Sequence, residues 1–115
     1  MIAPGTGVQV YIACGTTDMR RGIQGLSAAA QNVLNKDPCS KAVFAFRGRK
    51  GDRIKLLYYD GQGFCLYYKV LNRGFFPWPS ANTGSLELTS AQLSMLWEGI
   101  DWRRPEWTAA PKRVA

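Results

Sequence analysis

The sequence predicts a single α+β domain: an antiparallel sheet of about four to five strands with two amphipathic helices packed mainly on one of its faces. Its 115 residues are enough for one domain with its own core. A hydrophobic content of 46% with 12% aromatic residues is typical of a globular chain. The order strand, helix, three or four strands, helix indicates the fold class. We expect the domain to span residues 1–102, followed by a basic, flexible tail at residues 103–115.

The first predicted elements are a strand and a turn. Residues 8–13 (VQVYIA) are rich in β-branched and aromatic side chains and lie between two glycines, a pattern typical of a strand. Residues 15–18 (GTTD) predict a turn into a helix, with Thr17 or Asp18 as the N-cap.

The first helix is predicted from one apolar stripe at helical spacing. The stripe consists of Met19, Ile23, Leu26, Ala30, Val33 and Leu34. Because Pro38 disfavours helical geometry in the residue before it, the helix should end near residues 35–37.

Three strands are predicted in the middle of the chain, at residues 42–47, 53–59 and 64–71. Residues 60–63 (DGQG) between the last two are a strong hairpin signal. The loop of this hairpin could have two or four residues. Facing positions in the two strands then have residue numbers that sum to 121 or 123, and both registers put the same side chains on one face. This face could stack nucleobases, but its aliphatic members favour core packing. Its members are Arg53, Lys55, Leu57, Tyr59, Phe64, Leu66, Tyr68 and Val70.

The last third of the domain contains an aromatic segment, a short strand and a helix. Two prolines in residues 75–79 (FFPWP) exclude a central strand and favour an extended or edge segment. Residues 85–88 predict a strand, and Thr89 with Gln92 three residues later matches a capping box. The helix that follows has an apolar side formed by Leu93, Leu96, Trp97 and Ile100.

The positive charge is concentrated in the middle of the chain. The sequence has 15 lysines and arginines against 8 aspartates and glutamates, which gives a formal charge of +7. Residues 41–73 hold eight of these bases and two of the acids. Such clustering is typical of proteins that contact nucleic acids or other polyanions.

The residue types that are scarce or missing exclude several kinds of site. With no histidine, the chain lacks the commonest general base and the partner that activates Ser or Cys nucleophiles. The three cysteines have no CxxC spacing, and the eight acids have no recognisable pairing for a metal-dependent nuclease. We therefore expect no catalysis, metal or cofactor. The absence of signal-peptide and membrane-span patterns favours a cytoplasmic protein.

The first candidate site is the basic segment at residues 47–55. Arginine forks match phosphate geometry, and a glycine-framed turn between strands can reach a nucleic-acid backbone. The alternative is a solvated hairpin tip whose charges keep the protein in solution. Arg20 or Arg21 could add to an anion site. The candidate nucleic-acid-binding residues are Arg47, Arg49, Lys50, Arg53, Lys55, Lys69 and Arg73.

The second candidate site is the aromatic segment. Its prolines hold Phe75, Phe76 and Trp78 extended, which makes these residues candidates for a partner-binding surface. An equally good interpretation is a lid over an open end of the core. Trp97 and Trp107 are further candidate anchors for a protein partner.

Several separated motifs together resemble a known family. They are residues 17–22 (TDMRRG), 44–47 (FAFR), 51–61 (GDRIKLLYYDG), 63–69 (GFCLYYK), 74–79 (GFFPWP) and 93–102 (LSMLWEGIDW). In this order they resemble TnpB, the accessory protein encoded by the second open reading frame of the bacterial insertion sequence 66 family, over residues 8–102. Phe76, Tyr59 and Tyr67 are minor departures from the family pattern.

The resemblance implies a non-catalytic helper in DNA transposition, which works beside a larger transposase and another small protein. The family's basic positions match at Arg47, Arg53, Lys55 and Lys69, and we expect DNA at the transposon ends to be a partner. The family has no established site residues to carry over. We expect the basic hairpin region to contact DNA phosphates. The alternative is a module that docks on the transposase or its partner subunit without significant DNA binding.

Overall fold

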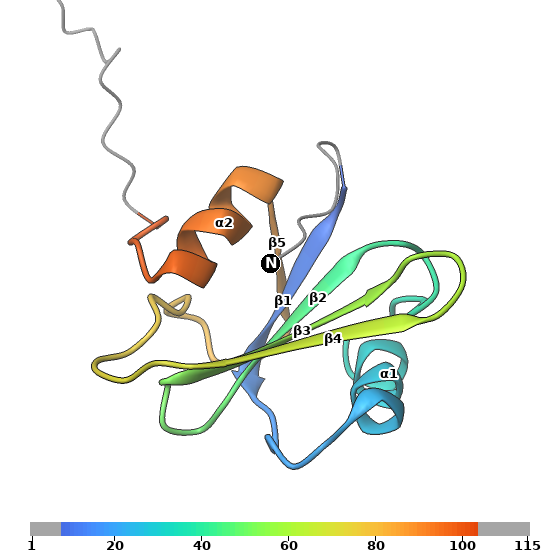
Figure 1. The fold of residues 1–115 in the computed structure, drawn as a ribbon, viewed down its shortest axis with the longest axis horizontal. Coiled ribbons are helices and arrows are strands. Elements are labelled where there is room, and N and C mark those ends of the chain that lie inside the picture. The colour runs from blue at the N-terminus through green and yellow to red at the C-terminus, as the bar shows by residue number, and fades with distance from the viewer. Residues whose placement is uncertain (1–7, 104–115) are drawn as a thin grey trace, which may run out of the picture.

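The computed structural model describes residues 8–103, which form a five-stranded sheet with one helix on each face (Figure 1). The α+β class is confirmed, and the strands lie in the order β4-β3-β2-β1-β5. None of the described helices is long and apolar enough to span a membrane. The elements are β1 (Val10–Thr16), α1 (Ile23–Asn32), β2 (Val43–Arg47), β3 (Arg53–Tyr59), β4 (Phe64–Val70), β5 (Ser85–Leu88) and α2 (Ser90–Glu98).

The sheet is mixed, which corrects the expectation of an antiparallel sheet at one strand pair. β1 and β2 run parallel, and the other three neighbouring pairs are antiparallel. α1 connects β1 to β2, and a crossover through a helix lets the next strand run in the same direction. The parallel pair therefore follows from the order β1, α1, β2.

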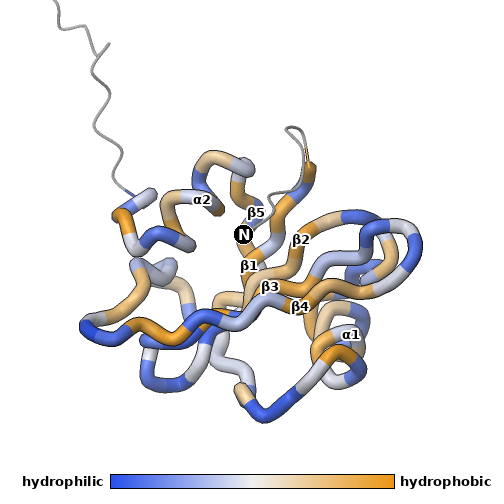
Figure 2. The backbone as a smooth tube through the Cα atoms, viewed as in Figure 1, coloured by the Kyte–Doolittle hydropathy of each residue, from blue (hydrophilic) through white to orange (hydrophobic). Residues whose placement is uncertain are grey.

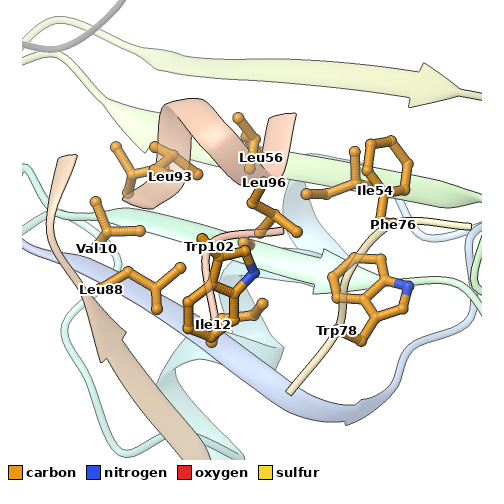
Figure 3. Close-up of a cluster of buried hydrophobic side chains, with 12 residues drawn as sticks. Val10, Ile12, Ile54, Leu56, Phe76, Trp78, Leu88, Leu93, Leu96 and Trp102 are labelled. Carbon is orange, nitrogen blue, oxygen red and sulfur yellow. The ribbon is translucent and has the colours of Figure 1, made fainter. Parts of the chain in front are cut away.

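The two helices lie on opposite faces of the sheet, so the expectation that both pack mainly on one face is wrong. Side chains alternate along β2, and both of its faces are apolar, as a central strand covered on both sides requires. The cluster with α1 includes Leu26, Ala30, Phe44, Phe46 and Leu57. The cluster with α2 includes Val10, Ile12, Ile54, Leu56, Leu93, Leu96 and Trp102 (Figure 3).

The hairpin of β3 and β4 has the predicted register. Arg53 lies opposite Val70 and Tyr59 opposite Phe64, so paired positions sum to 123 and the loop has four residues. The Asp60 carboxylate accepts the backbone N–H groups of Gln62 and Gly63 at 2.9 and 3.0 Å, which lowers its pKa. This Asx turn fixes the loop that the sequence predicted.

α1 begins later than predicted, because the backbone before it is committed to other contacts. Its N-cap is Gly22 rather than Thr17 or Asp18, and no side chain caps it. The Lys55 ammonium donates to the carbonyls of Met19 and Arg21, both at 2.8 Å, in the segment where the helix was expected to start. α1 also ends at Asn32, before the predicted residues 35–37.

The capping box of α2 is confirmed. The Thr89 hydroxyl accepts the Gln92 backbone N–H at 3.1 Å, and the Gln92 side chain accepts the Thr89 N–H at 2.9 Å. After the helix, the chain returns to the core at Trp102, whose indole N–H donates to the Pro77 carbonyl at 2.7 Å. Of the predicted tail at residues 103–115, all but Arg103 lies outside the described residues.

Candidate nucleic-acid interface

A groove of about 540 Å³ opens between the loop that follows β1 and the turn between β2 and β3. It is lined by residues 16–20, residues 48–50 and Arg53. We call it the basic groove, because the one acid in its lining, Asp18, is outnumbered by four exposed bases. Figure 2 shows hydrophilic chain in the loops at this end of the sheet, as well as in the turns at the opposite end. The four bases are Arg20, Arg49, Lys50 and Arg53.

The two walls of the basic groove meet because β1 and β2 are parallel. Thr16 and Arg47 are register partners, so the chain leaves both strands at the same edge of the sheet. The Thr17 N–H then donates to the Arg47 carbonyl at 2.8 Å. A Cβ on Gly48 would lie 3.0 Å from the Met19 side chain, so glycine at this position permits the close approach of the two loops.

Acidic neighbours pair with two of the four groove bases and leave the other two unpaired. The Arg20 guanidinium and the Asp18 carboxylate lie 2.7 Å apart, and hydrogen bonds from Arg20 hold the pKa of Asp18 well below its usual range. Arg53 lies 3.7 Å from Asp52 and donates to the Tyr68 hydroxyl at 3.2 Å. Arg49 and Lys50 have no acidic partner among residues 8–103.

The aromatic segment, residues 75–79, contacts the turn between β2 and β3 and holds it in place. The Gly51 carbonyl accepts both the Phe76 backbone N–H and the Trp78 indole N–H at 2.9 Å. The Arg47 guanidinium lies 5.3 Å from the centre of the Trp78 ring, within cation–π range. Gly51 has a φ of +80°, which favours glycine. The turn that carries Arg49 and Lys50 is therefore held in place at Gly51.

Phe76 and Trp78 are part of the core rather than of an exposed surface. Their exposed fractions are 3% and 6%, and both belong to the cluster under α2. This burial agrees with the lid interpretation of the segment. Of the three aromatic candidates, Phe75 is exposed. Trp97 is partly buried against the same cluster, and Trp107 lies outside the described residues.

Comparison with known proteins decides the family. Residues 8–107 match the family described as IS66 Orf2 like protein. The chain belongs to the IS66 Orf2-like family. It is 47% identical to the uncharacterised protein y4hO of Sinorhizobium fredii over 99% of both chains, and 36% identical to y4jC of the same organism over 90% of this chain and 89% of that one. No solved structure matches it.

Membership of the IS66 Orf2-like family confirms the resemblance found in the sequence motifs and implies an accessory role in transposition. Both relatives are uncharacterised, so they assign no site residues to this chain. In this IS66 Orf2-like chain, three of the seven predicted basic site residues, Arg49, Lys50 and Arg53, line the basic groove.

Three of the seven basic candidates are engaged within this IS66 Orf2-like domain. Lys55 is 7% exposed, with its ammonium on two backbone carbonyls of the loop after β1. Lys69 donates to the Trp97 carbonyl at 2.6 Å, on the face that α2 covers. Arg47 packs against Trp78, and its Nε is buried without a hydrogen-bond partner.

The other four candidates are exposed, and three of them meet at the basic groove. These three are Arg49, Lys50 and Arg53, whereas Arg73 lies in the turn after β4. Arg20 joins them from the loop after β1. The sequence named Arg20 only as an addition, because its meeting with Arg49 depends on the parallel pairing of β1 and β2, which the sequence analysis did not predict.

Proposed function

We propose that this protein is a non-catalytic accessory subunit of a transposition complex, and that it binds DNA phosphates through the basic groove and Arg73. The observation that carries the DNA contact is the meeting in one groove of four exposed bases, from the loop after β1, the turn between β2 and β3, and the start of β3. Family membership supports the accessory role. The two parts are independent, so each has its own test.

The geometry of the groove suits a phosphate backbone. Guanidinium groups bind phosphate oxygens through two parallel hydrogen bonds, and three of the four groove bases are arginines. Arg49 and Lys50 carry charges that no described acid neutralises. Their turn is fixed by the bonds to Gly51, so less side-chain and loop ordering opposes binding.

The salt dependence of DNA binding tests the phosphate contacts. Five contacts, from the four groove bases and Arg73, give a slope of log affinity against log salt of about −4.5 for duplex DNA. Affinity for a transposon-end duplex should therefore fall about 500-fold between 50 and 200 mM salt. Fluorescence anisotropy with this duplex and a scrambled one measures the slope and any sequence preference. A slope near zero would contradict the proposal.

A pair of matched variants locates the contacts. Arg49→Glu with Lys50→Glu should reduce the slope by about 2 and weaken binding at least tenfold at low salt. The control is Lys36→Glu with Lys41→Glu, which changes the net charge equally but at the other end of β2. Equal loss in both double variants would show that net charge, rather than the groove, drives binding.

The non-catalytic part of the proposal is supported by the accessory role that the family implies. Among residues 8–103, no group of three or more His, Cys, Asp or Glu side chains is placed to hold a metal ion. Incubation of purified protein with magnesium and end DNA should leave the DNA uncut. Reproducible cleavage that persists through purification would overturn this part.

The docking-module alternative has less exposed surface than the sequence suggested. Phe76 and Trp78 are buried, which leaves Phe75 as the exposed member of the predicted partner surface. A complex with the transposase that survives high salt, together with no binding of DNA at low salt, would favour this alternative over phosphate contact.

A further inference from the structure

Phe75 is exposed beside the turn that carries Arg49 and Lys50. Its exposed fraction is 73%, the highest among the large hydrophobic side chains of the described residues. The neighbouring Phe76 points into the core and is 3% exposed. Two consecutive phenylalanines thus lie in opposite environments, and core packing does not explain the first of them.

The backbone that carries Phe75 is held by contacts with the turn between β2 and β3. Its Cδ1 lies 3.4 Å from the position that a Cβ on Gly51 would occupy. On its C-terminal side, Phe76 is fixed by its backbone bond to the Gly51 carbonyl and by burial. On its N-terminal side, Gly74 has a φ of +78° and forms a turn. The ring therefore lies against Gly51, the residue after Lys50, on a backbone that is held on its C-terminal side.

Exposed basic residues lie close to Phe75 along the chain and in the turn that its ring contacts. Arg73 precedes it by two residues, and Arg49 and Lys50 adjoin Gly51 in the turn that it contacts. Asp52, the nearby acid, lies 3.7 Å from the Arg53 guanidinium. Aromatic residues and arginine are common at protein interfaces, but Arg49 and Lys50 have no acidic partner among residues 8–103, which favours a partner that carries negative charge. A partner that combines flat apolar faces with negative charge fits better.

We propose that Phe75 stacks on an unpaired nucleobase of single-stranded DNA whose phosphates lie on Arg49, Lys50 and Arg73. This inference rests on the proposed function, which supplies the phosphate contacts. An aromatic ring beside a basic track is the arrangement by which single strands are bound, since every base offers a π face. Bases inside a duplex are already stacked on both faces, so the site selects unpaired ones.

A pair of oligonucleotides with equal charge tests the stacking. The protein should bind a thymidine decamer about 5- to 150-fold more tightly than an abasic decamer with the same number of phosphates. Phe75→Ala should reduce the affinity for the thymidine decamer to the abasic level and leave abasic binding unchanged. Phe75→Trp should keep the preference, with tryptophan fluorescence that the thymidine decamer quenches more than the abasic one does.

The control variant is Ile100→Ala, which removes another exposed apolar side chain, 53% exposed, after α2. It should keep the full preference for thymidine. Equal, salt-dependent binding of both decamers by the parent would overturn the stacking and leave the phosphate contacts standing. Equal weakening of both by Phe75→Ala would overturn it as well, since the ring would then only support the turn. No binding of any oligonucleotide or duplex at low salt would overturn both proposals.

Discussion

At the scale of the residue, Lys55 shows that a cluster of basic residues in a sequence does not reveal which of their side chains are exposed to a ligand. It lies in the same run as Arg49, Lys50 and Arg53, yet it is nearly buried. Its ammonium lies on the Met19 and Arg21 carbonyls and 4.7 Å from the centre of the Tyr68 ring. These contacts tie β3 to the loop that forms one wall of the basic groove.

Lys55→Met should therefore lower the free energy of unfolding by about 1–3 kcal/mol, because two hydrogen bonds from a charged group are lost. Lys50→Met, on an exposed side chain, should change it by less than about 0.5 kcal/mol but should weaken DNA binding. Urea denaturation and anisotropy measure the two effects. If Lys55→Met were as stable as the parent and bound DNA as poorly as Lys50→Met, Lys55 would belong to the DNA footprint.

At the scale of the element, local signals predicted the strands well and tertiary contacts decided the rest. The bounds of β3 and β5, the hairpin register and the capping box follow from turn residues and from alternation within a few positions. The start of α1 does not, because Lys55 takes backbone acceptors that lie 34 and 36 positions away. The parallel direction of β2 relative to β1, and the face of the sheet on which α1 packs, likewise depend on how β1, α1 and β2 assemble.

The same contrast holds for the two helix starts. Thr89→Ala removes the capping box of α2 and should lower the free energy of unfolding by about 1 kcal/mol. Gly22→Ser supplies a side-chain cap that α1 lacks, and a Cβ there meets no atom within 4 Å, so it should raise that free energy by a few tenths of a kcal/mol. Thermal unfolding of both variants measures the changes. A destabilising Gly22→Ser would contradict the reading of α1 as uncapped.

At the scale of the whole molecule, topology brings together what the sequence keeps apart. The sequence identified the bases of residues 47–55 and their chemistry, and the family resemblance in its motifs. It did not reveal that Arg20 faces them across a groove, or that Lys69 lies with α2 on the other face. The first fact follows from the parallel pair of the mixed sheet, which sends two loops out at one edge. The second follows from the position of α2, because the hairpin register alone places Lys69 on the face opposite Lys55.

The last described residues, Trp102 and Arg103, contact the core of the molecule. Trp102 is 6% exposed within the α2 cluster (Figure 3), and the Arg103 guanidinium donates to the Trp78 carbonyl at 2.8 Å. A chain that ends after Arg103 should keep the melting temperature of the full chain. A chain that ends after Ile100 lacks Trp102, so its free energy of unfolding should fall by about 3–5 kcal/mol, as when a core tryptophan is truncated.

The shorter chain should also bind DNA more weakly, because the Trp102 indole N–H holds Pro77, which lies between the two residues that fix Gly51. Scanning calorimetry and anisotropy on both truncated chains separate the effects. If the chain that ends after Arg103 melted well below the full chain, residues 104–115 would contribute to the fold, and the domain would extend beyond the boundary near residue 102. If the chain that ends after Ile100 kept its stability and its DNA binding, the contacts of Trp102 would not be what fixes the turn.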